Sequence, residues 1–278
     1  NLFNLNDDSF IIRGCYLSPF AKSIIENNLN LIDGLIFDGT FKILKHYVTC
    51  LIMAVSHNTS IPLGFTFSPF EDNYLYENVF QTFLEITSID LSNFVIESDQ
   101  GDHLLNVCKK YHCKHFCCQR HLSVNLLKKK YGFEANKLIS CRCQNDFELL
   151  CNELNKLFKV KSGNLKQIFE TTLNYVGLTF ENDEISVKNS ERWEEVSLKE
   201  RVKYKMPPTT NSIESVHGHL NEATPRNNLF FSSIFRIIMS INTQIKQFNE
   251  KVHHNYRKII NDIKKKMILL LLINVNFI

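Results

Sequence analysis

The sequence predicts a mixed α/β fold, in which a three-strand antiparallel meander continues into further strands and helices flank the sheet. Three observations lead to this prediction. Strand-like apolar stretches follow one another closely between residues 31 and 70. After residue 70 the apolar period alternates between helical and strand-like. Residues 134–206 then keep a helical period, which predicts an all-helical insertion.

Composition predicts a globular protein. The chain has 278 residues and is 44% hydrophobic, enough for one large domain or two small ones with a packed core. Nine cysteines without a secretory leader favour reduced thiols or metal ligands, and hence a protein inside the cell. No apolar run approaches the roughly 20 residues of a membrane helix, so no membrane partner is expected.

The first 30 residues are expected to form a lead-in of helix and loop, with Pro19 opening a helix. Three strands should follow, over residues 31–42, 46–57 and 61–70. Strands this close in sequence form an antiparallel meander.

The period then becomes helical over residues 73–87, and Glu71 and Asp72 precede this helix at the end where its dipole favours negative charge. The remaining elements of this first core part, residues 31–133, alternate in type. We expect a strand at 94–96, a helix at 102–112, a strand at 114–118 and a helix at 121–132.

After the insertion, residues 207–225 are expected to form a core helix and residues 226–278 a long basic amphipathic helix with an apolar tail. Residues 226–266 contain nine Lys or Arg and two acidic residues, so positive charge gathers near this end. The long helix could contact DNA phosphates, pack on the core or pair with a second copy in a homodimer. The tail is expected to dock, with a surface anchor or an artefact of the gene prediction as alternatives.

Two aspartates directly follow apolar strand cores. Asp38 follows Leu35–Phe37, and Asp99 comes shortly after a second apolar run at 94–96. A strand that is apolar on both faces lies in the middle of a sheet, so both carboxylates are expected at the ends of central strands. On adjacent strands they would repel each other unless a cation lay between them, and oxygen ligands suit Mg²⁺ or Mn²⁺. The alternative for Asp38 is an Asp-Gly turn.

Glu214 is the candidate for a third carboxylate. It follows Thr209–Ser212, which can cap a helix and bring Glu214 into the first turns. Two ions about 3.5 to 4 Å apart, held by three carboxylates, can activate water and stabilise the leaving oxygen in phosphodiester cleavage. The alternative is an ordinary acidic residue near a helix N-terminus.

Four motifs occur in a defined order along the chain: FDGTFK at 37–42, ESDQG at 97–101, CCQRH at 117–121 and TTNSIES at 209–215. Together they resemble the catalytic domain of Mutator-like (MULE) transposases, which are DDE transposases with an RNase H-like fold. The resemblance spans residues 8–225. It implies that Asp38, Asp99 and Glu214 are the catalytic acids and that they bind two Mg²⁺ or Mn²⁺ ions.

The implied reaction is hydrolysis at a transposon end, followed by attack of the freed 3′-hydroxyl on target DNA. Double-stranded DNA is then the partner and the nucleus the expected location. Cys118 and His121 also match a motif of this family and could hold half of a zinc site; the alternative is a buried Cys beside a His that lines a DNA channel. The residues expected to contact DNA are Lys42, Arg120, His217, His219 and Arg226, although the two histidines could equally be ordinary polar residues.

Two other functions are compatible with the same residues. A domesticated or decayed transposase would bind DNA or protein without cutting it. An RNase H-like nuclease would hydrolyse DNA without joining ends. The zinc-binding recognition module and Cys-rich SWIM finger that often accompany this family do not occur in the sequence, so site-specific recognition of transposon ends is not expected from this chain. Trp193 in the insertion is expected to be a core residue.

Overall fold

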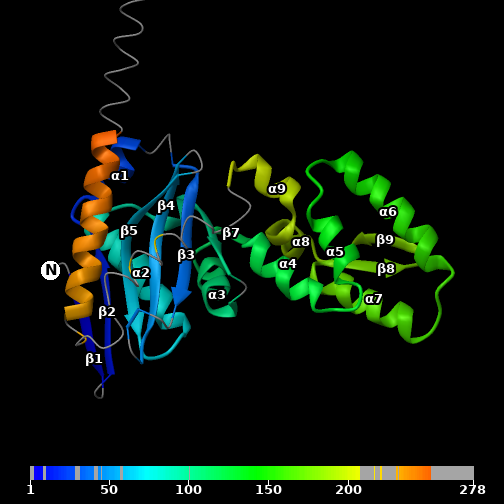
Figure 1. The fold of residues 1–278 in the computed structure, drawn as a ribbon, viewed down its shortest axis with the longest axis horizontal. Helices are drawn as coiled ribbons and strands as arrows, with labels where there is room; N and C mark the ends of the chain where they lie inside the picture. The colour runs from blue at the N-terminus through cyan, green and yellow to red at the C-terminus, as the bar shows by residue number, and fades with distance from the viewer. Residues whose placement is uncertain are drawn as a thin grey trace, which may run out of the picture.

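The structure, a computed structural model, contains a seven-stranded mixed sheet and a second lobe beside it (Figure 1). The residues that it describes are 3–8, 11–28, 32–40, 43–44, 46–56, 59–99, 101–206, 216, 220, 230 and 232–251.

The centre of the sheet is the predicted meander. Strands β3 (Gly34–Thr40), β4 (Val48–Ser56) and β5 (Thr59–Ser68) pair antiparallel, β4 lying between the other two. Strand β6 (Val95–Ser98) adds parallel to β3, and β7 (Lys114–Cys117) adds parallel to β6. This combination of a meander with parallel strands confirms the predicted mixed α/β, RNase H-like fold.

The prediction of helix and loop for the first 30 residues was wrong for its first half. Strands β1 (Phe3–Asp8) and β2 (Ile11–Leu17) form a hairpin, and β2 pairs antiparallel with β5. The edge of β5 provides unpaired backbone groups that another strand can satisfy, and such a partner is not visible in a local apolar pattern. Helix α1 (Ala21–Asn28) follows Pro19 as predicted.

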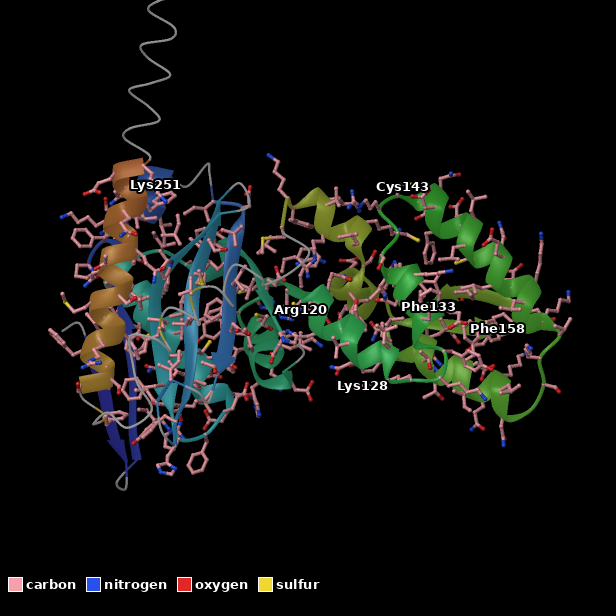
Figure 2. The ribbon with its side chains drawn as sticks, viewed as in Figure 1. Arg120, Lys128, Phe133, Cys143, Phe158 and Lys251 are labelled. Atoms are coloured by element: carbon pink, nitrogen blue, oxygen red, sulfur yellow. The ribbon has the colours of Figure 1, made fainter. Side chains whose placement is uncertain are left out.

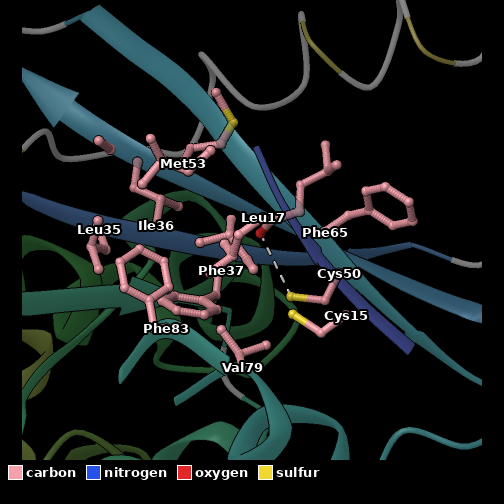
Figure 3. Close-up of a cluster of buried hydrophobic side chains, with 14 of the residues drawn as sticks. Cys15, Leu17, Leu35, Ile36, Phe37, Cys50, Met53, Phe65, Val79 and Phe83 are labelled. Atoms are coloured by element: carbon pink, nitrogen blue, oxygen red, sulfur yellow. Dashed lines mark hydrogen bonds between the residues drawn. The ribbon is translucent and has the colours of Figure 1, made fainter. Parts of the chain in front are cut away.

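Two helices cover one face of the sheet. They are α2 (Asn73–Thr87) and α3 (Asp102–Lys110), and a short 3₁₀ turn at Leu91–Asn93 lies between them in sequence. Phe37 of β3 stacks on Phe80 of α2 with ring centroids 6.3 Å apart. Figure 3 shows the same face, where Phe37, Val79 and Phe83 meet below the strands.

A helix formed by residues 232–251 lies on the opposite face (Figure 1). Its apolar stripe is buried in the core of the sheet, through Ile234, Ile237, Ile241 and Ile245. Asn242 on this helix accepts hydrogen bonds from Tyr16 Oη at 3.2 Å and Ser18 Oγ at 2.8 Å. Of the three roles that the sequence left open, packing on the core is therefore the one that the stripe performs. The expected continuation beyond residue 251 and the apolar tail lie outside the described residues.

The second lobe contains six helices and a hairpin. The helices are α4 (Gln119–Leu127), α5 (Gly132–Ile139), α6 (Gln144–Lys159), α7 (Asn164–Tyr175), α8 (Ser190–Val196) and α9 (Leu198–Lys203). The prediction of an all-helical insertion was wrong, because β8 (Leu178–Glu181) and β9 (Glu184–Val187) pair antiparallel. Asn182 and Asp183 form the turn with φ of 51° and 64°, the left-handed conformation that tight hairpin turns require. The apolar start of β8 continues the period of α7, which hid the hairpin.

The second lobe has a hydrophobic core of its own. Phe158 of α6 stacks on Phe169 of α7, and Trp193 is buried against Phe147, as expected for a core residue. Leu122 and Leu126 of α4 also belong to this core, so it begins before residue 134.

A buried ion pair joins the two lobes. Nη1 of Arg201 on α9 lies 2.8 Å from Oε2 of Glu97 on β6, and both side chains are completely buried. Arg201 also donates a hydrogen bond to the carbonyl of Cys117 and lies over the ring of Phe116. Burial raises the pKa of Glu97 to about 7, although the charge of Arg201 acts in the opposite direction.

All nine cysteines are free thiols, in agreement with the prediction that they form no disulfide framework. Within the part of the chain that the structure describes, no helix has the length and apolarity to cross a bilayer.

We predict that Arg201→Met destabilises the protein by about 3 to 5 kcal/mol at pH 8, because Glu97 then remains as a buried charge without its cation. The loss should be smaller at pH 5, where Glu97 takes up a proton and no charge is buried. Urea unfolding at both pH values measures this, and Arg201→Met combined with Glu97→Gln should recover much of the loss. Lys203→Met, which breaks a pair between the exposed Lys203 and Glu200, is the matched control and should leave the stability nearly unchanged at both pH values. An equal loss at both pH values would contradict the assigned role of Glu97.

Candidate functional site

The parallel pairing of β3 with β6 brings Asp38 beside Asp99. Leu35 pairs with Ile96 and Ile36 with Glu97. Asp38 lies two residues farther along β3, and Asp99 directly follows the last residue of β6, so both acids lie at the same edge of the sheet. Both are half-buried. Because β3, β6 and β7 are parallel, their carboxyl ends meet at one edge of the sheet, where open α/β sheets bind their ligands.

Electrostatics supports the same grouping and adds a third carboxylate. Cys50 of β4 is completely buried, and burial raises the pKa of its thiol. The negative charges of Asp38, Asp99 and Glu71 raise it further, in that order. All three carboxylates therefore lie close enough to act on one buried group.

Glu71 reaches the site from the turn before α2. Its Oε1 lies 3.8 Å from where a Cβ would stand on Gly39 and 3.7 Å from where one would stand on Gly101. The Oδ1 of Asp99 lies 3.2 Å from the same point on Gly101. Tyr76, buried on α2, donates a hydrogen bond of 2.9 Å to Glu71 Oε1. Glu71 Oε1 therefore lies near both Gly39 and Gly101, and a buried phenol orients it.

Sequence reasoning missed Glu71 as a site residue. The sequence explains it as a charge at a helix N-terminus, but Asp72 performs that role: it caps α2 through a 2.9 Å bond from Leu75 N. A helix needs one such cap, so the second acidic residue was the available signal. The direction in which the Glu71 side chain points depends on how α2 packs on the sheet, which the sequence alone does not show.

Backbone contacts fix the Asp99 turn. Asp99 Oδ1 accepts a hydrogen bond from Gly101 N at 3.1 Å, and Ser98 Oγ donates to the Asp99 carbonyl at 2.8 Å. Cys118 N donates to Ser98 O at 2.7 Å, which attaches the start of α4 to the end of β6. The N-terminus of α4, with its positive dipole end, therefore lies next to the acidic residues.

Cys118 and His121 lie together at this helix N-terminus. A hydrogen bond with Cys118 raises the pKa of His121 to about 9, and the charges of Asp38 and Asp99 add to the effect. The half-buried His121 is therefore a cation at neutral pH and lies near the two aspartates. Arg120 is exposed where the two lobes meet (Figure 2). Among the described residues, no third potential ligand joins Cys118 and His121, and zinc at this pair stays a prediction.

Several predicted site residues lie outside the described residues, and the structure does not test their roles. They are Lys42, Glu214, His217, His219 and Arg226. Of the expected core helix at 207–225, Val216 and Leu220 are described, and both are buried in the core of the sheet.

The donor set fits a hard divalent cation. Asp38, Asp99 and Glu71 offer half-buried carboxylate oxygens, the ligand type that Mg²⁺ and Mn²⁺ prefer. Their oxygens do not all lie within 4.8 Å of one another, so these side chains would have to move for all three to hold one ion. Three grouped carboxylates repel one another, and a bound cation would relieve that repulsion.

A comparison with solved structures finds several similar chains, one of which is described here. No family model matches the chain, and no curated protein matches it. A solved structure of the HTLV-2 integrase catalytic core domain, in complex with magnesium and in a dimeric form, is similar with a TM-score of 0.21 and 20% sequence identity. The match covers 60% of this chain and 97% of that one.

We predict that Mg²⁺ or Mn²⁺ stabilises the protein against heat, because the ion binds the carboxylates only in the folded state. At about 100 times the dissociation constant the melting temperature should rise by about 5 °C or more. Asp99→Asn should remove this response, and Glu71→Gln should weaken it. Glu85→Gln, on the exposed side of α2, is the matched control and should respond like the wild type. A full response in Glu71→Gln would exclude Glu71 from the ligand set.

We also predict that Asp99→Asn lowers the pKa of His121, because it removes one of the negative charges that favour the protonated ring. Adding Mg²⁺ to the wild type should lower it in the same direction. An NMR titration of the imidazole between pH 6 and about 10 measures both shifts. If neither change moves the titration, His121 does not face the carboxylates.

Proposed function

We propose that this chain is the catalytic domain of a DDE-type DNA transposase of the Mutator-like kind, which cleaves and joins DNA strands with divalent metal ions. One observation carries the proposal: β3 and β6 pair in parallel, which brings Asp38 and Asp99 to the same carboxyl edge of the sheet. The order of the four sequence motifs supports the finer assignment to Mutator-like transposases. Double-stranded DNA as substrate, a nuclear location and pairing with a second copy belong to the same proposal.

The residues have distinct roles in this proposal. Asp38, Asp99 and Glu214 hold the ions, with Glu71 as a further oxygen donor that Tyr76 orients. When bound, Mg²⁺ or Mn²⁺ would activate the attacking hydroxyl and stabilise the leaving oxygen of an in-line phosphoryl transfer. His121 carries a proton at neutral pH and supplies positive charge beside the carboxylates.

The surface around the site suits a phosphate backbone. The N-terminus of α4 provides backbone N–H groups and a positive dipole end, and Arg120 and His121 lie in its first turn. Lys128 and Lys130 are exposed farther along the same lobe. These cations supply contacts that do not depend on sequence, in keeping with the expectation that end recognition requires other modules.

The two alternatives predict different products. A binding factor without catalysis would shift DNA in a gel but leave it intact in Mn²⁺. A purely hydrolytic nuclease would nick DNA without joining the 3′ end to a second duplex. The grouping of acidic residues at the sheet edge favours catalysis over simple binding, because a binding surface for DNA gains nothing from clustered negative charge.

We predict that Asp38→Asn, Asp99→Asn and Glu214→Gln each lower Mn²⁺-dependent nicking of a labelled duplex by about 10²- to 10³-fold or more, because each removes charge that stabilises the transition state. A second labelled duplex detects joining of the freed 3′ end. Glu85→Gln is the control and should nick at the wild-type rate. Wild-type nicking in all three variants would refute the site. Nicking that is normal in Glu214→Gln alone would favour Glu71 as the third acid.

A further inference from the structure

A second group of potential ligands lies at the edge strand β7, apart from the carboxylates. His115 and Cys117 are two residues apart on β7, so their side chains point to the same face of the sheet. Glu195 of α8 reaches them from the second lobe. One ligand atom from each of these three buried residues lies within 4.8 Å of the others.

The hydrogen bonds of His115 define its tautomer. Ser98 Oγ donates its proton to the Asp99 carbonyl, so it can only accept from His115 Nε2, which lies 2.9 Å away. His115 Nε2 therefore carries the proton of the neutral ring, and Nδ1 has a free lone pair. Burial lowers the pKa of His115 to about 3, so the ring stays neutral.

The lone pair of Nδ1 has no hydrogen-bond partner among the described residues, although the side chain is 4% exposed. A buried acceptor without a partner is rare in folded proteins because it loses its bond to water without compensation. A metal ion would supply that partner. Zinc-bound histidines use one ring nitrogen as ligand and donate the other N–H to a neighbouring acceptor, as His115 does to Ser98.

A cation already bridges the other two ligands. Arg192 Nη1 donates to Cys117 Sγ at 3.2 Å and to Glu195 Oε2 at 3.1 Å. The Arg192 guanidinium therefore already places a positive charge between the Cys117 thiol and the Glu195 carboxylate. Arg192 Nε donates to the Tyr175 carbonyl at 3.2 Å, and this bond also breaks when the planar guanidinium turns away.

A cavity of about 290 Å³ opens beside these groups, between α3, β7 and α8. His115, Cys117, Arg192 and Glu195 line it together with Asp102 and Lys109 of α3. It is large enough to hold water molecules. A water could therefore complete a tetrahedral site that has three protein ligands.

We propose that His115, Cys117 and Glu195 bind a Zn²⁺ ion, with water as the fourth ligand. Nitrogen and sulfur donors select Zn²⁺ over the Mg²⁺ of the carboxylate site. Binding releases the thiol proton of Cys117 to solvent, turns the Arg192 tip into the cavity and draws the three ligand atoms to about 3.5 Å from one another. The ion would join α8 of the second lobe to β7, and through His115 and Ser98 to the backbone of Asp99.

The test measures Zn²⁺ binding to the full chain by competition with a chromophoric chelator, in excess Mg²⁺ to saturate the carboxylates. The wild type should bind one ion tightly. Cys117→Ser and His115→Ala should weaken binding by about 100-fold or more, and Ser98→Ala by about 10- to 100-fold. Arg192→Gln should tighten it, because the competing cation is gone. Cys118→Ser, which changes the adjacent thiol, is the matched control and should bind within about 3-fold of the wild type.

A Co²⁺ spectrum gives a second readout that reports directly whether a thiolate binds the ion. Wild type and Cys118→Ser should show thiolate-to-cobalt charge-transfer absorption, and Cys117→Ser should not. Absence of this absorption from the wild type would overturn the proposal, as would equal Zn²⁺ affinity in wild type and Cys117→Ser. Loss of zinc in Cys118→Ser and His121→Ala instead would assign the ion to that pair and also overturn it. DNA nicking is not measured, so the outcome is independent of the proposed function.

Discussion

The parallel pairing of β3 with β6 determines where charge gathers in this protein. A parallel pair aligns two carboxyl ends, so residues in the last part of one strand and directly after the other appear at the same edge of the sheet. Asp38 and Asp99 meet for this reason, and β7 brings the start of α4 to the same edge. An antiparallel β6 would send Asp99 to the opposite edge, and the two aspartates and the N-terminus of α4 would no longer lie together.

Bringing three carboxylates together opposes folding, because like charges repel and half-buried ones are poorly solvated. Neighbouring hydrogen-bond donors and a positive charge offset part of this repulsion. Tyr76 donates to Glu71, Gly101 N donates to Asp99, and the protonated His121 supplies a positive charge. Such a locally unfavourable arrangement is typical of a functional site in an otherwise consistent fold.

The second lobe holds β7 from both faces. On one face, Arg201 pairs with Glu97 beside Phe116; on the other, Glu195 and Arg192 approach His115 and Cys117. Alternate residues of a strand point to opposite faces, so four successive residues of β7 suffice for both contacts. His121 and Arg120 lie on α4, which belongs to the second lobe. The way this lobe packs on β7 therefore determines how these two side chains are oriented toward the carboxylates.

The local pattern of apolar residues was sufficient to predict much of the fold. The meander, α2, β6, α3, β7 and the paired acids at strand ends follow from apolar period and chain order, which act over a few residues. The hairpin β1–β2 was missed because an edge strand is selected by the neighbour that it pairs with, and β8–β9 was missed because its apolar residues continued a helical period.

The sequence alone therefore determined which strands would be central and that two aspartates would lie near their ends. Only the tertiary structure decided that Glu71 joins them, that the apolar stripe of residues 232–251 packs on the core, and that His115 and Cys117 meet Glu195, because these contacts join residues far apart in the chain and depend on how whole elements pack.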